Sequence, residues 1–189
     1  MTSWNAAALE GAAGYYLQAL ARNNSGVARV ADKMPHNFML IGLISILFPN
    51  AKIIHVKRNA ADTCLSIYLN NLKGRHDYAN DLAVLGKYYR SYASLMQHWH
   101  DLLGSKIHLC NYESLAGNPE TEIRQMLSYL DLPWNEKCLR FFDTERTVTT
   151  FSRGQVREPI HARSIGRWRK YEKHLAPLLD ELGNLHSAN

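Results

Sequence analysis

Residues 52–66 read KIIHVKRNAADTCLS, and this stretch decides the fold. Its first part, residues 52–57, is β-branched and apolar, which predicts a buried strand. Arg58 and Asn59 then form a turn, and a helical pattern follows over residues 60–72. A strand that passes through a short turn into a helix is typical of a parallel sheet covered by helices.

The rest of the chain continues this alternation. Residues 81–103 carry apolar side chains at helical spacing, Gly104 ends the pattern, and residues 106–111 predict a second strand. The same criteria predict short strands at 27–30 and 147–150, and helices over residues 4–21, 37–48, 119–130, 135–142 and 171–182. We therefore expect one α/β domain over residues 1–189, a three-layer parallel sheet flanked by helices, with an N-terminal helix inside residues 1–26.

The composition favours a small anionic ligand. The formal net charge of the 189 residues is +5, but basic and acidic side chains are interspersed, and no stripe of Lys and Arg with aromatics predicts a nucleic-acid groove. The most basic stretch is a predicted loop at residues 152–170. Residues 1–10 lack a signal-peptide pattern, and the longest apolar run, residues 38–48, is too short to cross a bilayer. We expect a cytoplasmic protein that binds neither membrane nor nucleic acid.

No metal site is predicted. The three cysteines, Cys64, Cys110 and Cys138, are far apart and form no CxxC motif, so we expect reduced thiols. None of the nine histidines forms a ligand pair; His98 and His100, for example, are two positions apart on a predicted helix and point to different faces.

Arg58, at the end of the first strand, begins a candidate phosphate-binding corner. An Asn at the next position can cap the following helix, whose N-terminus carries the positive end of the helix dipole. Ser66 lies about two helical turns further on, where its hydroxyl could reach the same anion. In the alternative interpretation, Arg58 pairs with Asp62 and Ser66 is an ordinary residue of a polar helix face.

Several segments in order carry a resemblance to a family. They are DKMPHNF (32–38), IGLISILFPNAKIIHVKR (41–58), DTCLS (62–66), NYESL (111–115), QVREPI (155–160) and GRWRKYEKHL (166–175). Over residues 27–185 the chain resembles the sulfotransferases that use 3'-phosphoadenosine 5'-phosphosulfate (PAPS), especially the bacterial enzymes in which this domain often follows tetratricopeptide repeats. The resemblance implies a fold like that of the P-loop nucleotide-binding proteins.

The resemblance also implies roles for the nucleotide site. It assigns Arg58 and Ser66 to the 3'-phosphate of PAPS and places the Tyr112 ring near the adenine, although a Tyr after a buried strand can equally be a core residue. The segment that closes over the nucleotide corresponds to Gly166, Arg167 and Arg169. The Arg-Lys-Gly that precedes this glycine in many cytosolic members is replaced here by His161, Ala162 and Arg163.

A further pair of residues corresponds to the transfer site. Related glycan sulfotransferases carry Glu-Lys before a Pro, with the Glu as catalytic base, so the resemblance makes Asp32 the base and Lys33 the contact to the sulfuryl group. The alternative is a helix cap and a solvated charge. The acceptor, a small molecule, a glycan or a peptide with a hydroxyl or amine, is expected to bind near Arg75, His76, Tyr78 and residues 153–161.

One family feature has no counterpart in the sequence. The family begins with a strand, a loop rich in Gly, Ser and Thr, and a helix, and this loop binds the 5'-phosphosulfate. The only turn before Asp32, at residues 23–26, follows a predicted helix. The fold is therefore expected to be incomplete at its N-terminus: a missing N-terminal segment, a second chain such as a homo-oligomer partner, or loss of catalysis would each account for this.

Two rival functions follow from the same residues. The first is a non-catalytic or truncated nucleotide-binding module that keeps only the 3'-phosphate site. The second is a small-molecule kinase, which would need a Walker motif GxxxxGK[ST] that the sequence lacks.

Overall fold

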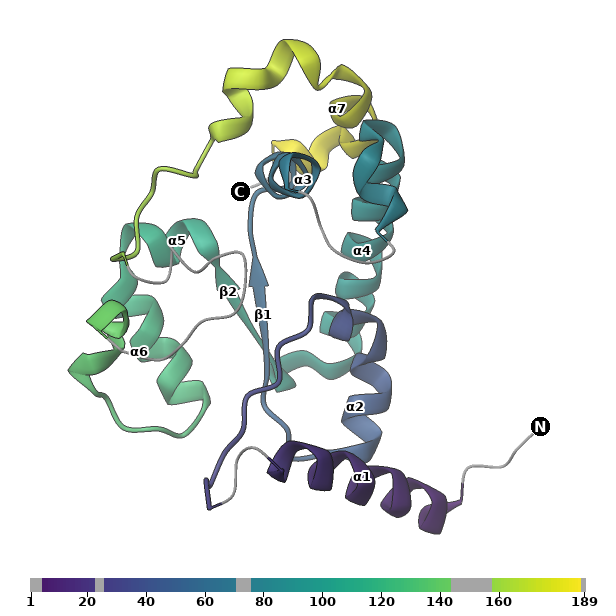
Figure 1. Cartoon of the computed structure of the whole chain (residues 1–189), viewed down its shortest axis with the longest axis vertical. Coiled ribbons are helices and arrows are strands. Elements are labelled where there is room, and N and C mark those ends of the chain that lie inside the picture. The colour runs from purple at the N-terminus through teal and green to yellow at the C-terminus, as the bar shows by residue number, and fades with distance from the viewer. Residues whose placement is uncertain (1–4, 23–25, 71–75, 144–157, 188–189) are drawn as a thin grey trace.

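The computed structural model contains a small parallel sheet surrounded by helices (Figure 1). It describes residues 5–22, 26–70, 76–143 and 158–187. Within them, β1 (Ile53–Lys57) pairs in parallel with β2 (Ile107–Asn111), in a register that runs from Ile53 opposite Ile107 to Lys57 opposite Asn111. The predictions of strands at 52–57 and 106–111 are confirmed to within one residue.

The helices follow the predicted order along the chain, and α5 is an additional helix that was not predicted. The α-helices are α1 (Ala6–Ala21), α2 (Ile41–Leu47), α3 (Ala60–Leu69), α4 (Leu82–Leu103), α5 (Tyr112–Gly117), α6 (Pro119–Tyr129) and α7 (Ala176–Leu182). Short 3-10 helices include η1 (Pro35–Leu40), η2 (Asp77–Asn80) and η7 (Arg167–His174). In Figure 1, α3 lies at the carboxyl end of β1, α4 and α2 flank one side of the sheet, and α5 and α6 lie on the other.

Three of these α-helices begin at polar caps. The side chain of Asn5 accepts a hydrogen bond from the Ala8 N–H at 2.9 Å at the start of α1, and α3 and α4 begin in the same way. The side chain of Asn59 accepts a hydrogen bond from the Asp62 N–H at 3.2 Å, and that of Asp81 accepts from the Val84 N–H at 2.8 Å. Each cap satisfies one of the backbone donors that a helix leaves unpaired in its first turn. The predicted cap at Asn59 is confirmed, and α3 ends at Leu69 instead of near residue 72.

Other elements differ from the predictions. Residues 27–30 are exposed irregular chain, because no strand of the described part lies beside them to form a ladder. The helix predicted over 37–48 begins as the 3-10 helix η1, and the one over 171–182 divides into η7 and α7. Only 3-10 turns, at Glu136–Cys138 and Phe141–Asp143, replace the helix predicted over 135–142. The strand predicted at 147–150 lies outside the described residues.

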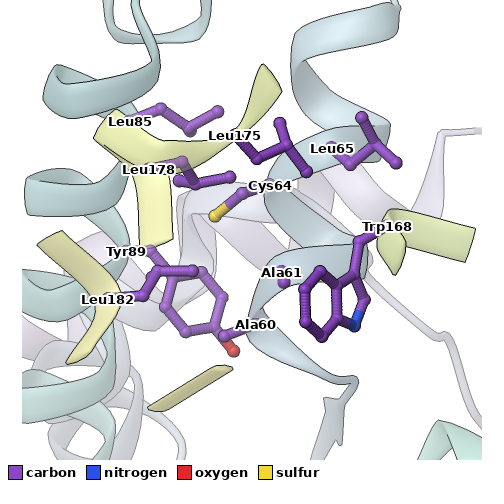
Figure 2. Packing of buried hydrophobic residues seen from close by; sticks show 10 residues of the cluster. All are labelled: Ala60, Ala61, Cys64, Leu65, Leu85, Tyr89, Trp168, Leu175, Leu178 and Leu182. Atoms are coloured by element: carbon purple, nitrogen blue, oxygen red, sulfur yellow. The ribbon is translucent and has the colours of Figure 1, made fainter. Parts of the chain in front are cut away.

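The main core lies between α3, α4 and α7 (Figure 2). Leu85, Leu178 and Cys64 are completely buried in it, and Trp168 from η7 closes one side. Helices α4 and α7 approach closely at Gly86, where an added Cβ would lie 2.6 Å from the Glu181 Cβ. A side chain at position 86 would therefore force the two helices apart.

A second core, formed by Ile41, Met96 and Ile107, lies beside the sheet. Tyr92 packs against both cores, and its hydroxyl lies 2.6 Å from His55 Nε2. His55 Nδ1 in turn lies 2.9 Å from His100 Nε2. Burial of His55, together with the nearby charges of His100 and Lys57, lowers its pKa from 6.5 to about 4.

The one buried charged side chain among the described residues is Asp62, which is 2% exposed. Its Oδ2 accepts from the Gly166 N–H at 2.6 Å and its Oδ1 accepts from the Trp168 N–H at 2.9 Å. Gly166 has φ of +68°, in the left-handed region that glycine tolerates best. Asp62 thereby fixes residues 158–174, which we call the C-terminal arm, to α3.

Replacing Asp62 by Ala should lower the free energy of unfolding by about 2 to 4 kcal/mol, because two charge-assisted hydrogen bonds are lost and two backbone donors lose their partner. Urea denaturation of D62A beside D180A measures this. Asp180 is exposed on α7, so its replacement should change stability by less than about 0.5 kcal/mol. Equal midpoints for the two variants would show that Asp62 does not hold the arm.

His55 should make stability depend on pH between its folded pKa of about 4 and its ordinary value of 6.5. In this window the unfolded chain binds more protons at position 55 than the folded one, so the free energy of unfolding should fall as the pH is lowered from 6.5 to 4. Urea midpoints measured across this range should vary less with pH in H55Q. The same slope in both proteins would exclude a buried neutral His55.

Candidate functional site

A cavity of about 730 Å³ opens at the carboxyl ends of the two strands. Ligands of open parallel sheets commonly bind at this edge. Its polar lining comes from five parts of the chain and includes His36, Arg58, Ser66, Tyr78, Tyr112 and Arg167. Four of the eight predicted site residues, Arg58, Ser66, Tyr112 and Arg167, therefore lie around one space.

Parallel pairing explains why Arg58 and Tyr112 meet. Because Lys57 lies opposite Asn111, the residues that follow each strand leave the sheet side by side, and the Arg58 guanidinium carbon lies 5.0 Å from the Tyr112 ring centroid. A cation over an aromatic face is attracted by the ring quadrupole. The next residues of the two segments are also in contact, because the Glu113 carboxylate accepts a hydrogen bond from the Asn59 N–H at 2.8 Å.

Arg58 has a hydrogen-bond donor that the described residues do not use. Its Nη2 donates to the Ser164 carbonyl at 2.5 Å, whereas its Nε is buried with no partner in the described part of the chain. The nearest carboxylate, Asp62, is 4.0 Å away, and both of its oxygens already accept from the C-terminal arm. Arg58 and Asp62 are therefore near each other, as the alternative interpretation predicts, but each also has hydrogen bonds to the C-terminal arm.

His161 provides a second buried nitrogen in the cavity lining. Its Nδ1 also has no partner among the described residues, and its Nε2 lies 3.8 Å from Glu158. Buried polar atoms are seldom left unpaired, so Arg58 and His161 both have hydrogen-bonding capacity that the described residues do not use. The sequence indicated position 161 as a departure from the family pattern and as the last residue of the loop, 153–161, that was predicted to lie near the acceptor.

Ser66 lines the cavity from α3, on the helix that Asn59 caps. Its hydroxyl has a weak contact, with the Asn70 amide nitrogen at 3.5 Å. Thr63 lies in the same lining, but its hydroxyl donates to the Asn59 carbonyl at 2.9 Å. Of these two hydroxyls, Ser66 is the one with more freedom to contact a ligand.

The three residues predicted for the segment that closes over the nucleotide make different contacts. Arg167 lines the cavity, the Gly166 N–H donates to Asp62, and the Arg169 guanidinium lies 5.3 Å from the Trp168 ring. Gly166 and Arg169 do not line the cavity. Trp168 is buried and anchors this segment in the core.

Asp32 and Lys33 are exposed and do not line the cavity. Asp32 Oδ2 accepts from the Tyr16 hydroxyl of α1 at 2.6 Å and from the Asn37 amide at 3.1 Å. The hydrogen bond to Asp32 raises the pKa of Tyr16 to about 12. The chain reaches the cavity immediately afterwards, at Pro35 and His36.

Aromatic residues form a wall that the sequence did not predict as a unit. Tyr88, Tyr89 and Tyr92 line the cavity from α4, together with Tyr78 from η2 and His36 from η1. The spacing of Tyr89 and Tyr92 predicted a packing face, and both do pack in the cores. Of these residues, only Tyr78 had been predicted to lie near an acceptor. Helical spacing predicts which side chains pack in a core, but it does not show that the same side chains also line a cavity.

The described residues contain no cluster of three or more His, Cys, Asp or Glu side chains that could hold a metal ion. None of the described helices is both long and apolar enough to cross a membrane.

Comparison with known proteins identifies relatives. A model of the sulfotransferase family matches residues 3–136. An uncharacterised protein of Aquifex aeolicus (strain VF5) is 41% identical over 177 residues, which cover 92% of this chain and 23% of that protein. A protein-tyrosine sulfotransferase of Drosophila melanogaster is 25% identical over 82% of this chain and 32% of its own length. A putative protein-tyrosine sulfotransferase of Caenorhabditis elegans is 24% identical, over 82% of this chain and 61% of the relative.

The chain thus spans between about a quarter and three-fifths of the length of these relatives. The family model covers more than half of the 189 residues and includes β1, β2 and the Arg58 corner. The chain belongs to the sulfotransferase family.

Proposed function

We propose that the chain is the part of a PAPS-dependent sulfotransferase that binds the 3'-phosphate of the nucleotide and carries out sulfuryl transfer to an acceptor hydroxyl or amine. The observation that carries this proposal is Arg58, which lines a cavity of about 730 Å³ and whose buried Nε has no hydrogen-bond partner in the described part. A guanidinium beside a helix N-terminus favours a phosphate over a neutral group.

The residues present suit the nucleotide half of PAPS. Arg58 and Ser66 contact the 3'-phosphate, the exposed ring area of Tyr112 lies beside the adenine, and Arg167 supplies a further positive charge. The cavity volume lies within the range of about 300 to 1,000 Å³ usual for small-molecule sites. Gly166 and Arg169 act indirectly, by fixing the turn and the Trp168 anchor that bring Arg167 to the cavity.

The bound donor supplies the sulfuryl group, and the chain must stabilise the charge that develops during transfer. Lys33 is the residue proposed to contact that group, with Asp32 one candidate for the base. Both precede Pro35 and His36, which lie in the cavity wall, by only a few residues.

We further propose that the loop for the 5'-phosphosulfate comes from a preceding segment of a longer protein or from a second copy of the chain. That segment would also add a strand and complete a three-layer sheet. The relatives are longer than this chain, and the exposed apolar side chains of α1 and α2, such as Tyr15, Leu17 and Ile46, offer a surface for it to cover. A cytoplasmic location and a reduced state of the cysteines remain part of this proposal.

A tyrosine hydroxyl is one acceptor that fits this proposal. The matched relatives from Drosophila and Caenorhabditis are named protein-tyrosine sulfotransferases, and the aromatic wall of Tyr78, Tyr88 and Tyr92 would suit a phenol ring. Small molecules and glycans are the other proposed acceptors.

A non-catalytic nucleotide-binding module is the second candidate function. It is favoured by the position of Asp32 and Lys33, which lie outside the cavity while Asp32 is hydrogen-bonded to α1. A module of this kind needs only Arg58, Ser66 and the C-terminal arm.

Replacing Arg58 by Ala should weaken binding of adenosine 3',5'-bisphosphate about 30- to 150-fold, the equivalent of about 2 to 3 kcal/mol for a charge-assisted contact. Calorimetric titration measures this loss. R90A is the matched control, because Arg90 is exposed on α4 and outside the cavity lining. Undiminished binding by R58A would refute the assignment of the phosphate site.

Replacing Lys33 by Ala should separate the two candidate functions. For a sulfotransferase, the rate of sulfuryl transfer from PAPS should fall at least about 100-fold, while the affinity for adenosine 3',5'-bisphosphate stays within about twofold. K87A, which removes an exposed lysine of α4, should change neither quantity. Nucleotide binding by the wild-type chain without any transfer, even after addition of the preceding segment, would favour the non-catalytic module.

A further inference from the structure

His36 is a proton-accepting side chain in the wall of the cavity. It lies in η1, is half-buried, and lines the same cavity as Arg58 and Ser66. Asp32, by contrast, is outside this lining and already accepts from Tyr16 and Asn37. A side chain can remove a proton in the transition state only if it reaches the reacting hydroxyl, directly or through one water.

Two other residues support the His36 imidazole. The Tyr78 hydroxyl lies 3.4 Å from His36 Nε2 and 3.2 Å from His76 Nδ1, so that it connects the two rings. The rings of His36 and His76 are nearly parallel, with centroids 5.4 Å apart and an interplanar angle of 10°. Tyr78 is itself held by Tyr88, whose ring stacks on it at 3.9 Å. Contacts of this kind are often long in the absence of substrate.

The direction of the Tyr78 hydroxyl decides which tautomer His36 adopts. If the Tyr78 hydroxyl donates to His76 Nδ1, it accepts from His36 Nε2–H, and the lone pair of His36 lies on Nδ1. The same hydrogen bonds persist when Nδ1 gains a proton, because Nε2–H still donates to Tyr78. In the reverse arrangement, the Tyr78 hydroxyl donates to His36 Nε2. A proton added to Nε2 would then point at the hydroxyl hydrogen, and the hydrogen bond would be lost. A base that cycles between neutral and charged forms therefore fits the first arrangement.

We propose that His36 is the base of the transfer reaction, with its Nδ1 accepting the proton and Tyr78 acting as a positioning residue. This inference rests on the proposed sulfotransferase function. The acceptor oxygen forms a bond to sulfur, its O–H proton passes to His36 Nδ1, and the bond from sulfur to the bridging phosphate oxygen breaks. The electron pair of that bond leaves with adenosine 3',5'-bisphosphate, and His36 later releases the proton to solvent.

The first test is independent of turnover. Long-range ¹H–¹⁵N NMR of the uniformly ¹⁵N-labelled chain at pH 8 distinguishes the two tautomers of each histidine, with H36A used to assign the His36 signals. We expect the Nε2–H tautomer for His36 in the wild type and a mixture of tautomers in Y78F. A predominant Nδ1–H tautomer in the wild type would overturn the proposal, because the lone pair would then face Tyr78.

The second test measures transfer from PAPS to N-acetyltyrosinamide, used as a probe acceptor. H36A should lower kcat at least about 100-fold, and added imidazole should restore part of the rate, whereas D32N, which removes the rival candidate for the base, should lose less activity than H36A. The control H98A, at an exposed position of α4, should change kcat less than about fivefold. All four proteins should bind adenosine 3',5'-bisphosphate equally.

The possible failures are distinguishable. A larger loss of kcat in D32N than in H36A, or a loss in H36A that imidazole does not restore, would overturn the role of His36 but leave the proposed function intact. If the wild type binds no nucleotide, the proposed function itself fails, and with it the role of His36 as base. If the wild type binds nucleotide without any transfer, the non-catalytic module is favoured and the role of His36 as base fails, whichever tautomer it adopts.

Discussion

The structure of the site depends on one buried carboxylate. Asp62 accepts hydrogen bonds from the backbone N–H groups of Gly166 and Trp168, residues more than 100 positions away in the chain. These bonds fix the C-terminal arm on α3, and Arg58 adds a second connection through the Ser164 carbonyl. Without them the cavity would lose the wall that Glu158, His161 and Arg167 provide.

The same carboxylate affects the charge of the site. Asp62 lies 4.0 Å from the Arg58 guanidinium, and a bare carboxylate there would compete with an incoming anion. Because its oxygens accept from two backbone donors, its negative charge is partly compensated, and Arg58 keeps a buried donor without a partner in the described residues. The site thus combines a stable frame with positive charge that is available to a ligand.

The corner at Arg58 could be predicted from the sequence because its parts are local or follow from parallel pairing. Arg58, Asn59 and Ser66 lie within nine consecutive residues, and Tyr112 follows the strand that pairs with β1. The role of Asp62 could not be predicted, since no periodicity indicates a hydrogen bond across such a separation. The position of Asp32 and Lys33 outside the cavity could not be predicted either, because Asp32 is held there by hydrogen bonds from Tyr16 and Asn37. The wrong strand at 27–30 shows that β propensity without a neighbouring strand gives irregular chain.

The most direct test of the account is a calorimetric titration of the wild-type chain with adenosine 3',5'-bisphosphate beside adenosine 5'-phosphate. The two ligands differ only in the phosphate assigned to Arg58 and Ser66. The account predicts at least about tenfold tighter binding of the bisphosphate, the equivalent of about 1.4 kcal/mol. Equal affinity for the two ligands, or binding of neither, would contradict it.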